Sequence, residues 1–116
     1  MTYSIEINEL NKFLSTGDTV TLLDVRRKTD YEATPQKIVG AVWRDPEKID
    51  IWVTQLPVCN RTVVYCVKGG SVSQSVAERM RREGLDALFL EGGLKAWIDN
   101  GQSIQDARPL NIITKP

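Results

Sequence analysis

Runs of β-branched residues that alternate with helical patterns constrain the fold of this chain more than any other feature. Residues 19–25 (TVTLLDV) and 61–66 (RTVVYC) are rich in β-branched residues and are typical of strands buried in a sheet, and 87–90 is expected to be a third strand. Helical patterns are expected at 8–14, 45–56, 72–83 and 93–100. This alternation predicts an α/β fold of three layers, with a mostly parallel central sheet flanked by helices on both faces.

Capping residues define the expected helix ends. Asn8 is expected to cap the first helix, and Asp45 followed by Pro46 is typical of the start of the second. Ser71 and Gln74 have the spacing of a capping box at the start of the third helix.

The length of the chain fits one domain. Its 116 residues are divided into an expected domain at 1–103 and a C-terminal tail at 104–116. Fifteen basic and fifteen acidic residues cancel, so no net charge favours nucleic acid or a membrane surface. No apolar run approaches the roughly 18 residues of a membrane span, and the N-terminus lacks a secretory signal pattern. A cytoplasmic location is therefore expected.

The two cysteines lie at either end of the second expected strand. An extended chain would separate Cys59 and Cys66 by roughly 23 Å, so a disulfide between them is not expected, and Cys59 is expected to be inert. The sequence contains no histidine, which excludes Ser-His and Cys-His catalytic arrangements. It also leaves too few ligands for a zinc site, so neither a metal nor a cofactor is expected.

Cys66 is the candidate catalytic residue because it lies between a strand and a glycine-containing loop. The strand ends at Cys66, a loop with Gly69 and Gly70 comes next, and a helix begins. Successive backbone N–H groups in such a loop, together with the positive end of the helix, favour a thiolate over a thiol. Lys68 adds a nearby positive charge. The plainer interpretation is an inert buried cysteine at a strand end.

Three segments, in this order, resemble the rhodanese-like sulfurtransferase family. They are LLDVR at 22–26 followed by IVGA at 38–41, VVYCVKGGS at 63–71, and LEGGLKAW at 90–97. The resemblance covers residues 4–103 and implies a rhodanese-like fold. The segment GAVWRDP at 40–46 also resembles the rhodanese-like part of chromate-resistance proteins.

The resemblance implies that Cys66 carries a persulfide. A small-molecule donor such as thiosulfate would supply the sulfur, and a thiol, cyanide or a protein would accept it. No nucleic acid or membrane partner is implied. The substrate-binding residues would be Val67, Lys68, Gly69, Gly70, Ser71, Val72 and Arg26.

Departures from the family pattern leave alternatives. Family members often have an arginine where this chain has Ser71, which favours a catalytically weak or inactive binding or regulatory module as the second hypothesis. A cysteine phosphatase or arsenate reductase would need an arginine at Val72 and is less favoured. Asp24 and Arg26 either brace adjacent loops or, for Arg26, face the Cys66 pocket. Trp97 is expected in the core.

Overall fold

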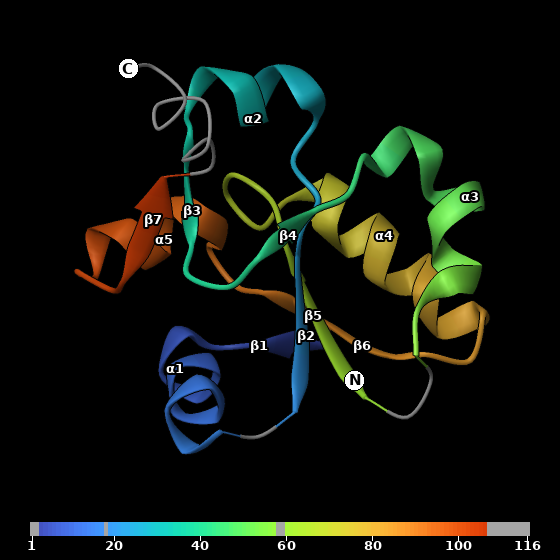
Figure 1. The fold of residues 1–116 in the computed structure, drawn as a ribbon, viewed down its shortest axis with the longest axis horizontal. Helices are drawn as coiled ribbons and strands as arrows, with labels where there is room; N and C mark the ends of the chain where they lie inside the picture. The colour runs from blue at the N-terminus through green and yellow to red at the C-terminus, as the bar shows by residue number, and fades with distance from the viewer. Residues whose placement is uncertain (1–2, 18, 58–59, 107–116) are drawn as a thin grey trace, which may run out of the picture.

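A five-stranded parallel sheet forms the centre of the protein (Figure 1). The computed structural model describes residues 3–17, 19–57 and 60–106. The sheet has the order β1-β6-β5-β2-β4, and every pair within it is parallel. The strands are β1 (Ser4–Ile5), β2 (Val20–Asp24), β4 (Val42–Trp43), β5 (Arg61–Tyr65) and β6 (Asp86–Leu90).

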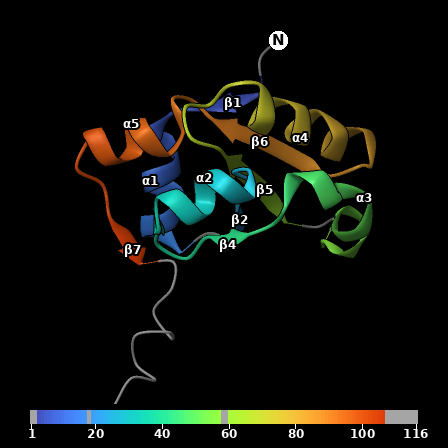
Figure 2. The ribbon, with the colours of Figure 1, turned by 90° about the horizontal axis from the view of Figure 1, so that it is seen from above.

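Helices cover both faces of this sheet, so the predicted α/β fold is confirmed. The helical elements are α1 (Ile7–Thr16), α2 (Lys28–Ala33), α3 (Ile49–Trp52), α4 (Ser71–Arg82) and α5 (Gly93–Asp99), with short 3₁₀ turns at Pro46–Lys48 and Val53–Gln55. Figure 2 shows α1 and α5 gathered towards one end of the molecule and α3 and α4 towards the other. None of the helices in the described ranges is long and apolar enough to cross a membrane.

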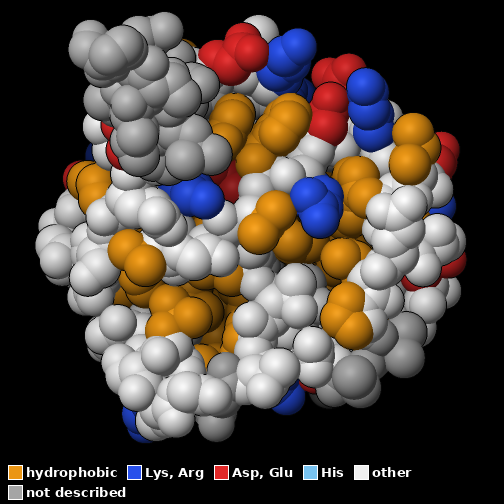
Figure 3. Space-filling view, in the orientation of Figure 1, with side chains coloured by type: hydrophobic (Ala, Val, Ile, Leu, Met, Phe, Trp, Pro, Cys, Tyr) orange, Lys and Arg blue, Asp and Glu red, His pale blue; other side chains and the backbone are white. Residues whose placement is uncertain are grey.

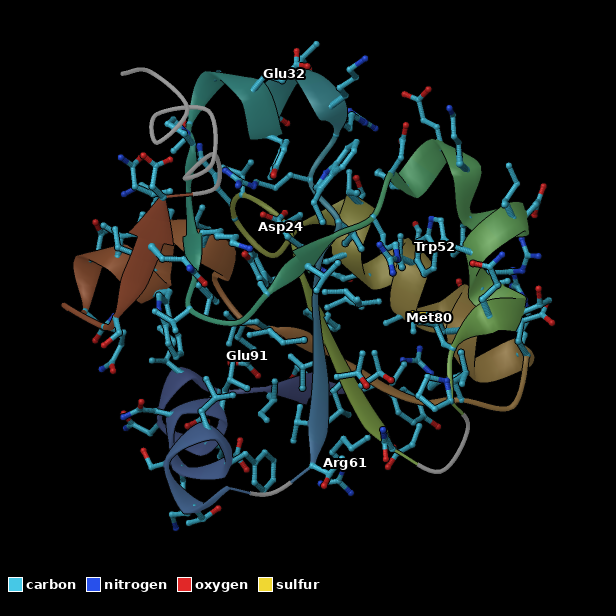
Figure 4. The ribbon with its side chains drawn as sticks, viewed as in Figure 1. Asp24, Glu32, Trp52, Arg61, Met80 and Glu91 are labelled. Carbon is cyan, nitrogen blue, oxygen red and sulfur yellow. The ribbon has the colours of Figure 1, made fainter. Side chains whose placement is uncertain are left out.

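Alternation along the strands builds a separate core on each face of the sheet. In β5, Val63 and Tyr65 pack with residues of α1 and α5, whereas Val64 between them packs with α3 and α4. Trp97 of α5 is buried in the first core, as predicted. Trp52 of α3 and Met80 of α4 belong to the second core (Figure 4).

The structure corrects two of the predicted helix starts. Asn8 lies inside α1, whose N-cap is Glu6, and the backbone N–H of Glu6 donates to Glu9 Oε1 at 3.0 Å. Ser71 is the first residue of α4, and the N-cap is Gly70, which has no side chain to cap with. The Asp45 cap is confirmed, because its carboxylate accepts from the N–H of Glu47 at 2.9 Å.

A small second sheet involves residues that were predicted to belong to the tail. Residues 104–106 form β7 (Ile104–Asp106), which pairs antiparallel with β3 (Gln36–Ile38). The sequence predicted neither of these strands. The remainder of the predicted tail, at 107–116, and Cys59 with its predicted lack of a disulfide lie outside the described residues.

Candidate active site

Cys66 comes directly after the last residue of β5, at the carboxyl ends of the parallel strands. Its residue is 5% exposed, and its Sγ lies 3.1 Å from Ser73 Oγ of α4. Cys66 belongs to the lining of a cavity of about 260 Å³. The lining residues come from the loops after β2 and β5 and the adjoining first residues of α2 and α4, and are Arg26, Arg27, Asp30, Cys66, Val67, Lys68, Gly70, Ser71 and Val72. This edge of a parallel sheet is where α/β proteins usually bind ligands.

The start of α5 holds the carbonyl groups of the loop after Cys66. The N–H of Leu94 donates to the carbonyl of Cys66 at 2.9 Å, and the N–H of Lys95 donates to the carbonyl of Val67 at 2.9 Å. These carbonyls therefore satisfy two of the free N–H groups that every helix start presents. The segment at 90–97, far along the chain, thus fixes the backbone of the cysteine loop.

Gln74 secures the other half of this loop. Its backbone N–H donates to the carbonyl of Gly70 at 3.2 Å, and its side-chain Nε2 donates to the carbonyl of Gly69 at 2.9 Å. In contrast, no backbone N–H from 67 to 72 donates to an acceptor within the described part of the chain. Four carbonyls of the loop, those of Cys66, Val67, Gly69 and Gly70, accept hydrogen bonds, while the loop N–H groups have no acceptor in the described ranges. This is the arrangement of a backbone anion site.

Two glycines, Gly69 in the loop and Gly93 at the start of α5, explain how the loop can lie so close to α5. Gly93 has a φ of +62°, and a Cβ there would collide with the carbonyl oxygen of Cys66 and lie 2.6 Å from the nitrogen of Gly69. Gly69 has a φ of +72°, and a Cβ on it would lie 2.7 Å from the nitrogen of Gly92. Only glycine combines this backbone conformation with such close approach.

The structure brings together most of the residues predicted for the site. Cys66 and six of the seven predicted substrate-binding residues line the cavity; these six are Arg26, Val67, Lys68, Gly70, Ser71 and Val72. Gly69 is not among the lining residues, because it packs against the backbone of Gly92. The catalytic and substrate-binding roles of these residues stay predictions.

Arg26 braces the adjacent loop and also borders the cavity. It is 1% exposed and pairs with the buried carboxylate of Asp24 at 2.8 Å. Its guanidinium also donates to the carbonyls of Thr34 and Gln36, at 2.9 and 3.1 Å. A buried arginine whose donors are occupied in this way holds the rim in place and has little capacity left for a ligand.

Asp24 also joins β2 to β5 at the upper end of the sheet (Figure 4). The hydroxyl of Tyr65 donates to Asp24 Oδ2 at 3.1 Å and accepts from the N–H of Ile38 at 3.2 Å. Burial and, secondarily, the charge of Asp24 raise the pKa of Tyr65 above its ordinary range. Tyr65 is therefore a neutral structural group next to the cysteine, not an acid or base.

Three further residues at the site were not predicted. Arg27 and Asp30 line the cavity, and Ser73 contacts the cysteine sulfur. Neither Arg27 nor Lys68 has an ion-pair partner among the described residues. A serine in line with the buried face of the predicted helix was the one sequence signal for Ser73, whereas Arg27 and Asp30 come from a different loop and carried none.

Charges of both signs are scattered over the face that Figure 3 shows, with apolar side chains between them. The charged residues that line the cavity itself are Arg26, Arg27, Asp30 and Lys68.

The fold and the site together define a class: a small α/β domain with one cysteine on a backbone anion-binding loop. Residues 6–100 match the family described as Rhodanese-like domain, and the chain belongs to that family. The predicted resemblance is confirmed, whereas the narrower likeness to chromate-resistance proteins stays a prediction.

Two curated relatives and a solved structure are similar to this chain. The chain is 29% identical over 104 residues to a "Sulfurtransferase" of Allochromatium vinosum, covering 90% of this chain and 95% of the relative. It is 30% identical over 81 residues to a tRNA 2-selenouridine synthase of Shewanella loihica, and this match spans 66% of the chain but only 21% of that longer protein. A rhodanese-like domain protein from Staphylococcus aureus superimposes with a TM-score of 0.75 at 28% identity, covering 91% of this chain and 100% of that structure.

Proposed function

We propose that the protein is a sulfurtransferase that carries a persulfide on Cys66. The observation that supports this most is that Cys66 borders a cavity and that the backbone N–H groups of the adjoining loop, from 67 to 72, have no acceptor within the described part of the chain. These donors suit a thiolate and, after loading, the negative outer sulfur of a persulfide. The chain achieves this without a histidine.

Thiosulfate is the proposed donor. The Cys66 thiolate forms a bond to the outer, sulfane sulfur of thiosulfate. The bond between the two sulfur atoms of thiosulfate breaks, and its electron pair leaves with sulfite. The products are one persulfide anion and one sulfite dianion, so the charge of the reactants is conserved.

Arg27 and Lys68 are the proposed contacts for the sulfonate group of the donor. Both line the cavity, and neither has an ion-pair partner in the described ranges. Ser71 occupies the position where family members often carry arginine, so the guanidinium of Arg27 would replace it from a different loop. Arginine matches a planar arrangement of oxygens better than lysine does.

The experiment is to treat the protein with thiosulfate, measure its intact mass, then add cyanide and quantify thiocyanate. Wild type and Cys59→Ser are expected to gain the mass of one sulfur atom and to produce thiocyanate. Cys66→Ser is expected to do neither while keeping its fold. Because Cys59→Ser is a matched cysteine replacement, the pair of variants identifies which cysteine binds the added sulfur atom.

The alternative of a binding or regulatory module makes the opposite prediction. It is favoured by Ser71 in place of arginine, and it requires wild type and Cys66→Ser to behave alike in this assay. A wild-type protein that neither gains sulfur nor releases thiocyanate would remove thiosulfate as the donor. A phosphatase activity is not proposed, because Val72 stands where the phosphate-binding arginine would be needed.

A further inference from the structure

Within residues 3–17, 19–57 and 60–106, Ser73 is the one residue whose side chain is hydrogen-bonded to the cysteine sulfur. It is fully buried, and its Oγ lies 3.1 Å from Cys66 Sγ. No other partner for this hydroxyl occurs among the described residues. A buried hydroxyl nearly always makes a hydrogen bond, and here the sulfur is its partner.

The position of Ser73 on α4 is otherwise an apolar one. It shares the buried face of the helix with Val76, Ala77 and Met80, at the spacing of successive turns. Alanine would fit such a position and has a higher helix propensity than serine. The hydroxyl therefore does nothing for the packing of α4, and its contact with Cys66 is the feature that needs an explanation.

We infer that Ser73 is a catalytic residue that stabilises negative charge on the sulfur of Cys66. In the thiol state the S–H group donates to Ser73 Oγ. When the sulfur is a thiolate, the hydroxyl rotates and donates to it, and hydrogen bonds to a charged acceptor are about twice as strong as those between neutral groups. In this inference the hydroxyl stabilises the inner sulfur of the persulfide, and the backbone N–H groups of the loop stabilise its outer sulfur.

The two roles differ in the second half of the proposed sulfurtransferase reaction, in which sulfur passes from Cys66 to the acceptor. This part of the inference rests on that proposed function. Cyanide forms a bond to the outer sulfur of the persulfide anion, and the bond between the two sulfur atoms breaks. The electron pair of that bond stays on Cys66 Sγ, which leaves as a thiolate, and the outer sulfur is released in thiocyanate. Ser73 touches the inner sulfur and stabilises it as the leaving group, while the loop N–H groups hold the outer sulfur.

The test compares Ser73→Ala with Ser75→Ala, both in a Cys59→Ser background so that Cys66 is the one cysteine present. Ser75 lies on the same helix but is exposed, so it is a matched loss of one hydroxyl. The first readout is the rate of alkylation by iodoacetamide as a function of pH. Ser73→Ala is expected to raise the midpoint of this profile by about one pH unit, a tenfold loss of thiolate at a fixed pH below it.

The second readout is the rate of thiocyanate release from persulfide-loaded protein, which is expected to fall about tenfold in Ser73→Ala alone. The inference is overturned if Ser73→Ala keeps the alkylation midpoint of its parent, or if Ser75→Ala shifts it equally. Alkylation needs no sulfur donor, so this result stands even if thiosulfate fails to load Cys66. Failure of the proposed function and failure of this inference are therefore distinguishable.

Discussion

Replacing Gly93 by alanine is expected to destabilise the protein much more than the same change at Gly101. Both glycines have positive φ, +62° and +72°, so an alanine at either position adopts a strained backbone. The surroundings differ: a Cβ on Gly101 has nothing within 4 Å, whereas a Cβ on Gly93 would meet the backbone of the cysteine loop, including the oxygen of Val67 at 2.7 Å. Gly101→Ala therefore measures only the free-energy cost of holding an alanine in the left-handed backbone conformation.

The expected magnitudes depend on these two situations. The left-handed conformation costs an alanine about 1–2 kcal/mol, which is the full expected effect at Gly101. At Gly93 the loop must also move away, which breaks the hydrogen bonds from Leu94 to Cys66 and from Lys95 to Val67. At about 1 kcal/mol for each bond, the loss at Gly93 reaches about 3–4 kcal/mol.

Urea unfolding of both variants, followed by tryptophan fluorescence, to which the buried Trp52 and Trp97 contribute, gives the two free energies of unfolding. Gly93→Ala is also expected to lower the alkylation rate of Cys66 under native conditions, because the loop N–H groups move with the backbone. Equal losses of stability in the two variants would refute the idea that close approach fixes the loop.

Three other changes test the buried polar groups. Arg26→Ala leaves the carboxylate of Asp24 buried without its ion-pair partner, and chemical denaturation is expected to show a loss of about 3–5 kcal/mol. Thr62→Val is expected to raise the free energy of unfolding by roughly 1 kcal/mol, because the buried Thr62 hydroxyl has no partner among the described residues. Because the pKa of Tyr65 is raised on folding, the folded state retains a proton that the unfolded state loses above about pH 10. Stability should therefore be unaffected by Tyr65 below that pH and fall by about 1.4 kcal/mol per pH unit above it, a slope that is absent in Tyr65→Phe.

The sequence predicted the elements whose patterns are long enough to be distinctive. The runs at 19–25 and 61–66 correspond to β2 and β5, and the amphipathic pattern at 72–83 corresponds to α4. The missed strands β1 and β4 are two residues long, and no periodicity can be read from two residues. Strands this short exist because neighbouring strands in the sheet supply their hydrogen bonds. The local sequence does not show which strands are neighbours.

The missed helix caps have two different origins. Serine and asparagine at Ser71 and Asn8 have a local preference for capping, but in each case the N-cap is an earlier residue, Gly70 or Glu6. At α4 the loop that precedes the helix is held from outside by Leu94 and Lys95, so its path sets where the helix starts. At α4, tertiary contacts therefore decided the boundary against a weak local preference, whereas at α1 a local capping box between Glu6 and Glu9 did so.

The predicted and unpredicted parts of the site differ in the same way. Cys66 and the loop after it are contiguous, so the strand, glycines and helix identified them together. Arg27 and Asp30 reach the cavity from the loop after β2 and the first turn of α2, and their presence depends on the adjacency of β2 and β5. The pairing of neighbouring strands is what joins the two loops at one edge of the sheet.

The chain has no histidine, so no imidazole titrates beside Cys66. The hydroxyl of Ser73 contacts the cysteine sulfur, and neither this hydroxyl nor the backbone N–H groups of the loop titrate between about pH 5 and 9, where an imidazole would. Their ability to stabilise a charged sulfur is therefore constant across this range. It depends on the positions that Gln74 and the start of α5 impose on the loop, so the reactivity of Cys66 is coupled to the packing of residues that never touch the sulfur.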